Sequence, residues 1–137
     1  MNDGPEQPSA TGQCLCGAVS YELRGPLREV INCHCGQCRR THGHFAAYTN
    51  VSRAQLRFVA DSGLKWFESS KVARRGFCGG CGASLFWERT GSGTISVAAG
   101  TLDAPTGLKT CAHIFVDNKG DYYELNDGLK TYPGTMG

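Results

Sequence analysis

Eight cysteines in a chain of 137 residues constrain this protein more than any other feature of its sequence. Seven of them fall into three short groups: Cys14 and Cys16, then Cys33, Cys35 and Cys38, then Cys78 and Cys81. A C-x-x-C turn lets two thiolates point at one ion, while nearby glycines allow backbone N–H groups to approach the sulfurs. This geometry suits tetrahedral zinc, so the spacing predicts metal binding.

Disulfides are the alternative use for these cysteines. Residues 1–11 lack the basic and apolar regions of a secretory signal, and no apolar stretch is long enough to cross a bilayer. We therefore expect a cytoplasmic, reducing location, where thiols do not pair and where strained bridges within C-x-C pairs are disfavoured. Four thiolates close a structural zinc site, and the remaining three leave one position open, as in catalytic zinc. A purely structural role for all seven stays an alternative.

The high glycine content favours a mainly β fold. The 19 glycines supply turn geometry and weaken helix interiors, and the chain length suffices for one domain with a modest core. We expect a single zinc-stapled domain of short antiparallel strands over residues 12–133. Polar, proline-containing segments at 1–11 and 134–137 are expected to be mobile tails.

Apolar residues that alternate with period two, bounded by turn residues, indicate where the strands lie. We expect strands at 18–23, 27–32, 45–51, 57–59, 64–68, 84–88, 94–97, 113–116 and 122–125, while residues 72–77 lead into the third cysteine group. The strands at 57–59 and 64–68 are expected to form a meander, and those at 84–88 and 94–97 a hairpin. Ser52 is expected to cap one helical turn, and a second short turn or loop is expected after Arg40.

The net charge of +2 comes from charges of both signs scattered along the chain. No basic stripe is available to neutralise a phosphate backbone. We therefore expect neither a nucleic acid nor a membrane as the partner.

Longer motifs surround the cysteine groups: G-x-C-x-C-G-x-V at 12–19, N-C-H-C-x-x-C-R-R at 32–40 and F-C-x-x-C-G at 77–82. In this order they resemble the glutathione-dependent formaldehyde-activating family, which also includes centromere protein V-like proteins. Residues 113–116 and 127–129 are similar to its C-terminal part, so the resemblance spans about residues 12–133. It implies a zinc-bearing β-tent fold.

The resemblance also implies two zinc ions. The ligands of the structural ion would be Cys14, Cys16, Cys78 and Cys81, and those of the second ion Cys33, Cys35 and Cys38. It further implies a carbon–sulfur lyase that makes or cleaves S-hydroxymethylglutathione from glutathione and formaldehyde. Three thiolates give the second zinc a formal charge near −1, which suits a fourth, substrate thiolate better than activation of water.

Charged and titratable residues beside the second group are candidates for the substrate site. Arg39 and Arg40 follow the third ligand directly and are candidates to bind a substrate carboxylate; a solvated pair is the alternative. We expect His34 to point away from the metal. His42 and His44 are candidates for proton transfer.

Cys111 stands outside the three groups, and we expect it to be a small buried side chain rather than a fourth ligand. Trp66, Phe86 and Trp87 are expected in the core. Two other functions remain open: a non-catalytic, zinc-stabilised binding module, and a thiol protein that responds to zinc or redox state. The sequence gives no expectation for the oligomeric state.

Overall fold

The computed structural model describes residues 7–136, and it is mainly β, as the sequence predicts. The small sheet has the order β1-β2-β5, formed by Ala10–Gln13, Ser20–Leu23 and Leu56–Ala60. The large sheet has the order β11-β10-β3-β4-β9-β8-β7-β6, formed by Lys130–Thr131, Thr110–Ile114, Val30–Cys33, Ala46–Ser52, Thr94–Ala98, Ser84–Arg89, Ala73–Cys78 and Leu64–Glu68. Helix α1 spans Gly36–His42, and short 3₁₀ helices lie at Arg53–Gln55 (η1), Ala99–Thr101 (η2) and Val116–Asn118 (η3).

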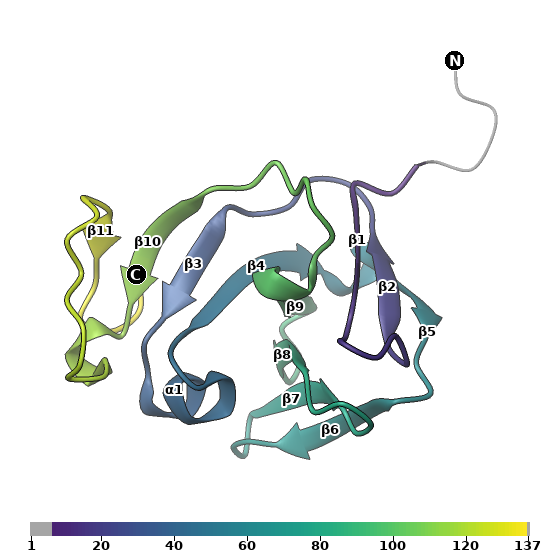
Figure 1. Cartoon of the computed structure of the whole chain (residues 1–137), viewed down its shortest axis with the longest axis horizontal. Coiled ribbons are helices and arrows are strands. Elements are labelled where there is room, and N and C mark those ends of the chain that lie inside the picture. The colour runs from purple at the N-terminus through teal and green to yellow at the C-terminus, as the bar shows by residue number, and fades with distance from the viewer. Residues whose placement is uncertain (1–6, 137) are drawn as a thin grey trace.

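The large sheet is curved. Its strands pair antiparallel, except that β10 runs parallel to both of its neighbours, β3 and β11. Figure 1 shows the sheet bending from β11 on the left through β4 to β6 at the bottom, with α1 on the concave side. The inner faces of strands that are distant in the sequence are therefore turned toward the same space.

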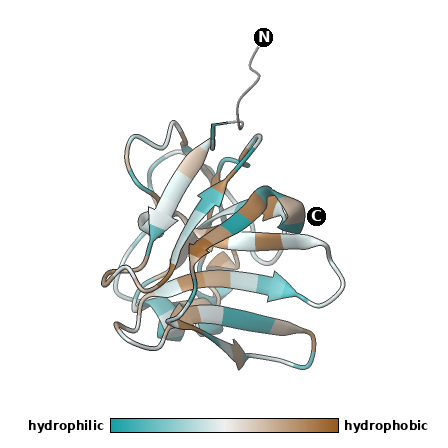
Figure 2. Cartoon of the chain, turned by 90° about the vertical axis from the view of Figure 1, so that its right-hand side faces the viewer, coloured by the Kyte–Doolittle hydropathy of each residue, from teal (hydrophilic) through white to brown (hydrophobic). Residues whose placement is uncertain are grey.

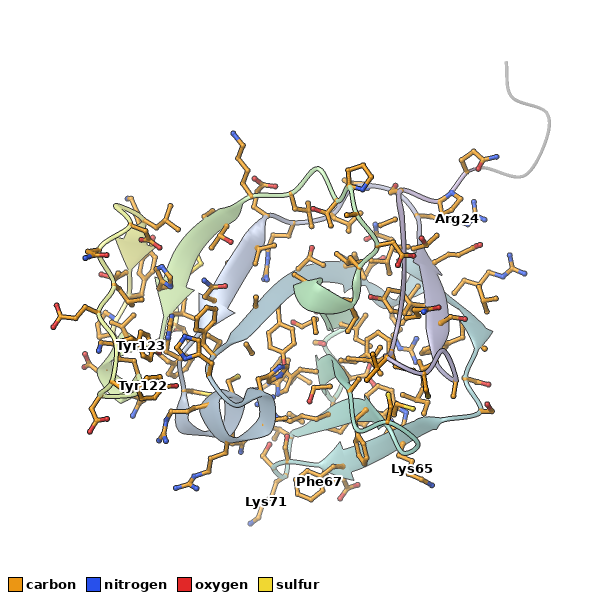
Figure 3. All side chains as sticks on the ribbon, viewed as in Figure 1. Arg24, Lys65, Phe67, Lys71, Tyr122 and Tyr123 are labelled. Atoms are coloured by element: carbon orange, nitrogen blue, oxygen red, sulfur yellow. The ribbon has the colours of Figure 1, made fainter. Side chains whose placement is uncertain are left out.

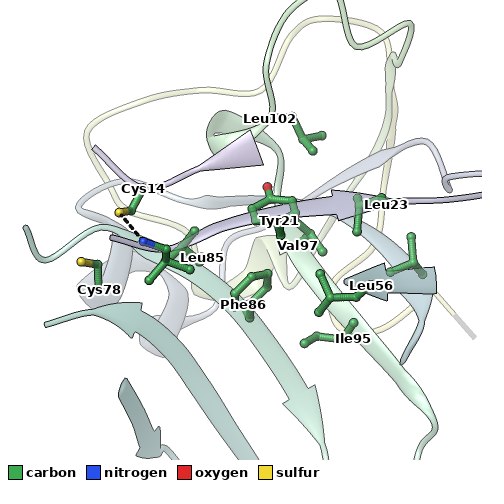
Figure 4. Packing of buried hydrophobic residues seen from close by; sticks show 12 residues of the cluster. Cys14, Tyr21, Leu23, Leu56, Cys78, Leu85, Phe86, Ile95, Val97 and Leu102 are labelled. Atoms are coloured by element: carbon green, nitrogen blue, oxygen red, sulfur yellow. Dashed lines mark hydrogen bonds between the residues drawn. The ribbon is translucent and has the colours of Figure 1, made fainter. Parts of the chain in front are cut away.

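The main core lies between the small sheet and strands β8 and β9 of the large sheet (Figure 4). In β2 the burial alternates, so that Tyr21 and Leu23 point inward, and the Tyr21 ring meets Phe86 edge to face at a centroid distance of 5.4 Å. Figure 2 shows apolar and polar segments following one another along the strands. Each fully buried side chain of this size contributes about 1.5–3 kcal/mol, so this layer carries much of the fold's stability.

Local sequence signals explain two features that the sequence predicted. The hairpin of β8 and β9 turns through Gly91 and Gly93, whose positive φ values of 76° and 75° favour glycine. The turn after β4 begins at Ser52, whose backbone N–H donates to Oε1 of Gln55 at 2.8 Å. The hairpin and the position of Ser52 at the N-cap of η1 are confirmed.

Three predicted strand features are wrong. The strands β5 and β6 do not form a meander, because β5 pairs with β2 in the small sheet and β6 pairs with β7 in the large one. Residues 122–125 form no strand; the chain there is irregular, and the pairing with β10 is made by β11. The strand predicted at 113–116 instead covers Thr110–Ile114.

The boundaries around α1 and the tails also differ from the predictions. The helix begins at Gly36, within the second cysteine group, because Cys35 caps it and Gly43 ends it with a left-handed φ of 82°. Of the predicted N-terminal tail, residues 1–6 lie outside the described part, while Ala10 and Thr11 belong to β1. Near the other end, the Gly134 carbonyl accepts a hydrogen bond from the Phe115 N–H at 2.9 Å, so the tail is attached there.

Within residues 7–136, no helix has the length and apolar character needed to cross a membrane.

Candidate metal centres and the cavity beside them

Four cysteines from two distant segments meet at one point, as the sequence predicts. Cys14 and Cys16 follow β1, Cys78 ends β7, and Cys81 lies in the turn before β8. The four sulfurs lie within 4.8 Å of one another, with separations of 3.8 Å for Cys14 and Cys16 and 3.7 Å for Cys16 and Cys78. A tetrahedron with metal–sulfur bonds of about 2.3 Å has sulfurs about 3.8 Å apart, so these donors fit zinc.

Backbone groups stabilise negative charge on these sulfurs. The Val19 N–H donates to Sγ of Cys14, and the Gly80 N–H donates to Sγ of Cys78, each at 3.3 Å. A backbone hydrogen bond from Ala83 lowers the pKa of Cys81 to about 6. Such N–H···S bonds are typical of cysteine knuckles around a metal ion.

The second group consists of Cys33 at the end of β3, Cys35 at the N-cap of α1 and Cys38 inside α1. Their sulfurs also lie within 4.8 Å of one another, and the Cys38 N–H donates to Sγ of Cys35 at 3.3 Å. Hydrogen bonds from the neighbouring thiols hold the pKa of Cys35 far below its usual range and raise that of Cys33. Three close thiols cannot all ionise without a cation, and a soft metal ion is the cation that fits three sulfurs.

A cavity of about 400 Å³ opens beside the second group. It is bordered by residues from the inner faces of the large sheet, from α1 and from the C-terminal segment. These are Arg28, Ile31, Cys33, Cys35, Gln37, Cys38, Tyr48, Asn50, Arg75, Trp87, Ser96, Ile114, Phe115 and Thr135. All three cysteines of the second group line the cavity and none of the first group does, so the two sites differ in their access to a small molecule.

Arg75, on β7, is the buried cation of this cavity, and the sequence analysis did not identify it. It is 6% exposed, and its guanidinium donates to Oη of Tyr48 at 3.2 Å, to Oε1 of Gln37 at 3.3 Å and to Sγ of Cys38 at 3.5 Å. Burial alone would lower the pKa of Arg75, but the Cys38 sulfur and the Tyr48 phenol raise it overall. The sequence signal that could have identified it is the period of two along β7, which places Arg75 on the same strand face as the buried Ala73.

Arg28 and Trp87 also line the cavity without having been predicted to do so. Arg28 donates from Nη2 to the carbonyl oxygen of Tyr48 at 2.9 Å, which fixes its side chain beside β4. Trp87, expected in the core, is half-buried and packs beside the second cysteine group. Phe86 is buried in the main core as expected, and Trp66 is half-buried against it.

Neither of the predicted substrate arginines lines the cavity. Arg40 is exposed on α1, and Arg39 is half-buried, with a buried Nε that has no hydrogen-bond partner among the described residues. Their role as ligands of a substrate carboxylate stays a prediction.

His34 points away from the second cysteine group, as expected. It is 0% exposed, and both ring nitrogens are occupied: Nδ1 lies 2.5 Å from Oη of Tyr123, and Nε2 lies 2.9 Å from Nδ1 of His113. The chain of contacts ends at Asp127, whose carboxylate lies 2.8 Å from Nε2 of His113. Figure 3 shows Tyr123 beside Tyr122 at this end of the molecule.

The other two histidines lie outside the cavity lining. Nε2 of His42 is 3.1 Å from Oη of Tyr48, and burial together with the charge of Arg75 lowers the pKa of His42 to about 4. His42 is thus neutral near pH 7 and touches the cavity only through Tyr48. His44 is exposed, with Nδ1 2.8 Å from Oη of Tyr122.

Cys111 is exposed on β10, at a bulge between Thr110 and Ala112, so the expectation of a buried side chain is wrong. Among the described residues it belongs to neither cysteine group. Within residues 7–136 the second group therefore consists of three cysteines.

Two curated proteins and one solved structure are similar to this chain. A protein of Schizosaccharomyces pombe named as an uncharacterized lyase is 26% identical over 120 residues, covering 86% of each chain. A protein of Halomonas elongata named "Putative glutathione-dependent formaldehyde-activating enzyme" is 24% identical, covering 83% of this chain and 79% of its own. A crystal structure of a Rhodobacter sphaeroides protein shares the fold, with a TM-score of 0.60 at 21% identity, covering 89% of this chain and 98% of its own.

The decisive comparison is with a protein family. The family described as GFA, glutathione-dependent formaldehyde-activating enzyme, matches residues 9–118, which include both cysteine groups and most strands of the two sheets. This chain belongs to the glutathione-dependent formaldehyde-activating enzyme family.

Proposed function

We propose that this chain is a zinc-dependent carbon–sulfur lyase that forms or cleaves the adduct of a thiol with a small aldehyde, S-hydroxymethylglutathione being the candidate. The observation that carries the proposal is that the three-cysteine group lines a cavity of about 400 Å³, within the size range of small-molecule sites. The family, and relatives named as a lyase and as a formaldehyde-activating enzyme, support the same activity.

The cysteine donors fit zinc in both groups, four in one and three in the other. Cys33, Cys35 and Cys38 would hold the second ion at the cavity wall. When bound, a soft, thiolate-rich zinc supplies a position that keeps a substrate sulfur in its thiolate form. The apolar side chains of Ile31 and Trp87 also line this cavity and would limit the access of water to the reacting groups.

The reaction needs no oxidant or reductant. The thiol sulfur adds to the carbonyl carbon, so a C–S bond forms, the C=O π bond breaks and the thiol proton ends on the former carbonyl oxygen. The reverse reaction breaks the C–S bond and returns that proton to sulfur. Tyr48 is the candidate group for moving the proton, because it lines the cavity, Arg75 donates to its oxygen, and Nε2 of His42, 3.1 Å from the same oxygen, can exchange a proton with its O–H.

Arg28 is the cavity's candidate partner for a substrate carboxylate. It lines the cavity, and its guanidinium is held by the Tyr48 carbonyl. Arg28 is exposed overall, and its hydrogen bond to Tyr48 is partly buried, so a carboxylate that meets its guanidinium there gains a charge-assisted hydrogen bond of about 1.5 kcal/mol.

Nuclear magnetic resonance exchange spectroscopy tests the activity. In a mixture of glutathione and formaldehyde, the zinc-loaded protein should accelerate the exchange between free glutathione and its hydroxymethyl adduct, and C35S should not. Calorimetry gives the binding: glutathione should bind more tightly than S-methylglutathione, because a thioether is a weak zinc ligand. Equal affinity for the two would place the peptide away from the metal, and an unchanged exchange rate would refute the lyase.

A further inference from the structure

Arg75 differs from the neighbouring arginine on β7. Arg74 points to the opposite face, where Nη2 lies 2.6 Å from a carboxylate oxygen of Glu88 and the guanidinium stacks 3.8 Å above the Trp66 ring. Arg75 faces the cavity together with its cross-strand neighbour Trp87. Two adjacent arginines thus occupy two different electrostatic environments.

No ion pair among the described residues includes Arg75. Its Nε is buried and has no hydrogen-bond partner in the same part of the chain. A buried guanidinium without a counter-charge is strongly unfavourable, and such groups are normally paired. The contact that offers a negative charge is Sγ of Cys38, at 3.5 Å, once that sulfur is a thiolate.

Counting formal charges shows what this contact does for the centre. Three thiolates and a divalent zinc leave one negative charge, which the guanidinium of Arg75 balances. A fourth ligand that is a thiolate then brings the assembly to one negative charge, instead of the two it would carry without Arg75. At a partly buried site the second excess charge is costly, because the low dielectric strengthens repulsion.

We propose that Arg75 is the counter-charge of the three-cysteine centre and that it sets the preference of this centre for an anionic thiolate over a neutral fourth ligand. Arg75 acts through Cys38 and is a positioning residue in this role. The inference rests on the proposed function in one respect, namely that a thiol binds at this centre.

The test uses full-length protein reconstituted with cobalt(II), whose sulfur-to-metal charge-transfer absorption reports each added thiolate. The thiol probe is 2-mercaptoethanol, which carries no carboxylate and therefore cannot bind an arginine as an anion of its own. The neutral probe is imidazole. The four-cysteine site adds the same background absorption to every variant.

In R75Q, the Kd for 2-mercaptoethanol should rise about tenfold or more, the loss expected for one charge-assisted interaction. The Kd for imidazole should change less than about threefold, because imidazole is neutral. The metal content should stay at two ions per chain, because the substitution removes one interaction with Cys38 and no cysteine donor. R74Q is the matched control: it removes the adjacent guanidinium on the opposite face and should leave both affinities unchanged.

R75K keeps the positive charge but loses the planar arrangement of guanidinium donors. It should retain 2-mercaptoethanol binding within about threefold, and it decides the matter if R75Q fails to fold. Loss of thiol binding in metal-replete R75K would show that hydrogen-bond geometry, not charge, is what the centre needs, and would overturn the proposal.

Three other results would also overturn it: equal thiol affinity in R75Q and wild type, loss of thiol and imidazole binding together, or weaker glutathione binding with unchanged 2-mercaptoethanol binding. The last would make Arg75 a carboxylate ligand. A wild-type protein that takes no thiol at all would instead remove the proposed function, and this inference with it.

Discussion

Substitution of Cys81 by serine should destabilise the whole domain, whereas substitution of Cys35 should not. The four-cysteine group joins Cys16 to Cys78 across 62 residues and ties the segment after β1 in the small sheet to the end of β7 in the large one. The three-cysteine group spans only residues 33–38, which β3 and α1 already hold in place. The two groups therefore stabilise the fold to different degrees.

The magnitude follows from the entropy of closing each loop. Closing 62 residues costs the unfolded chain (3/2)RT ln n, about 4 kcal/mol, whereas closing the five-residue step from Cys33 to Cys38 costs about 1.4 kcal/mol. Unfolding 137 residues carries an entropy of about 0.29 kcal/mol/K. Loss of the long link should lower Tm by about 14 °C or more, and loss of the short one by about 5 °C at most.

Thermal unfolding followed by circular dichroism, with zinc counted by elemental analysis, measures both effects. C81S should lose the structural zinc and the larger share of its stability, and C35S should lose one zinc with its transition nearly intact. C111S is the matched control, because Cys111 is exposed and belongs to neither group. If C35S unfolded as readily as C81S, the second centre would be structural, and the argument from loop length would be refuted.

Freshly purified, reduced wild-type protein should contain two zinc ions per chain by elemental analysis; one zinc with the remaining thiols as disulfides would defeat that division. Replacing Gly63 by alanine should lower zinc retention against a chelator and cost about 1–3 kcal/mol by overpacking, because its Cβ would lie 2.9 Å from Sγ of Cys78. H113F should cost about 1–3 kcal/mol in urea unfolding, since it leaves a buried nitrogen of His34 unpaired, while both zinc ions stay. R28A should weaken glutathione binding about tenfold in calorimetry, with R40A, which removes an exposed arginine outside the cavity lining, as the control; equal effects would remove Arg28 from the substrate site.

The short-range part of the fold could be predicted from the sequence. The hairpin of β8 and β9 follows from two alternating runs joined by Gly91 and Gly93, since turn chemistry and strand period are local properties. The pairing of β5 with β2 could not be predicted in the same way. These strands are separated by β3, α1 and β4, and the partner of a strand is chosen by core contacts such as those of Leu23 and Leu56.

The two cysteine groups could be predicted because the cysteine spacing and the family motifs indicate which residues belong to each. The structure brings each group together. The walls of the cavity could not. Tyr48, Trp87 and Ile114 come from three different strands, and only the curvature of the large sheet turns them toward one space. That curvature is a property of the assembled sheet and leaves no motif in the sequence.

The arginines show why adjacency in the sequence misleads at such a site. Arg39 and Arg40 directly follow Cys38 of the second cysteine group, and in a loop they could have faced the same cavity. Because α1 includes all three residues, each step along the chain turns the side-chain direction by about 100°, and both arginines leave the cavity wall. The guanidinium that reaches Cys38 comes from Arg75, 37 residues away on β7, where a period of two aims it inward. The helix thus separates the side chains of neighbours in the sequence, while the sheet brings a guanidinium from a distant strand to the second cysteine group.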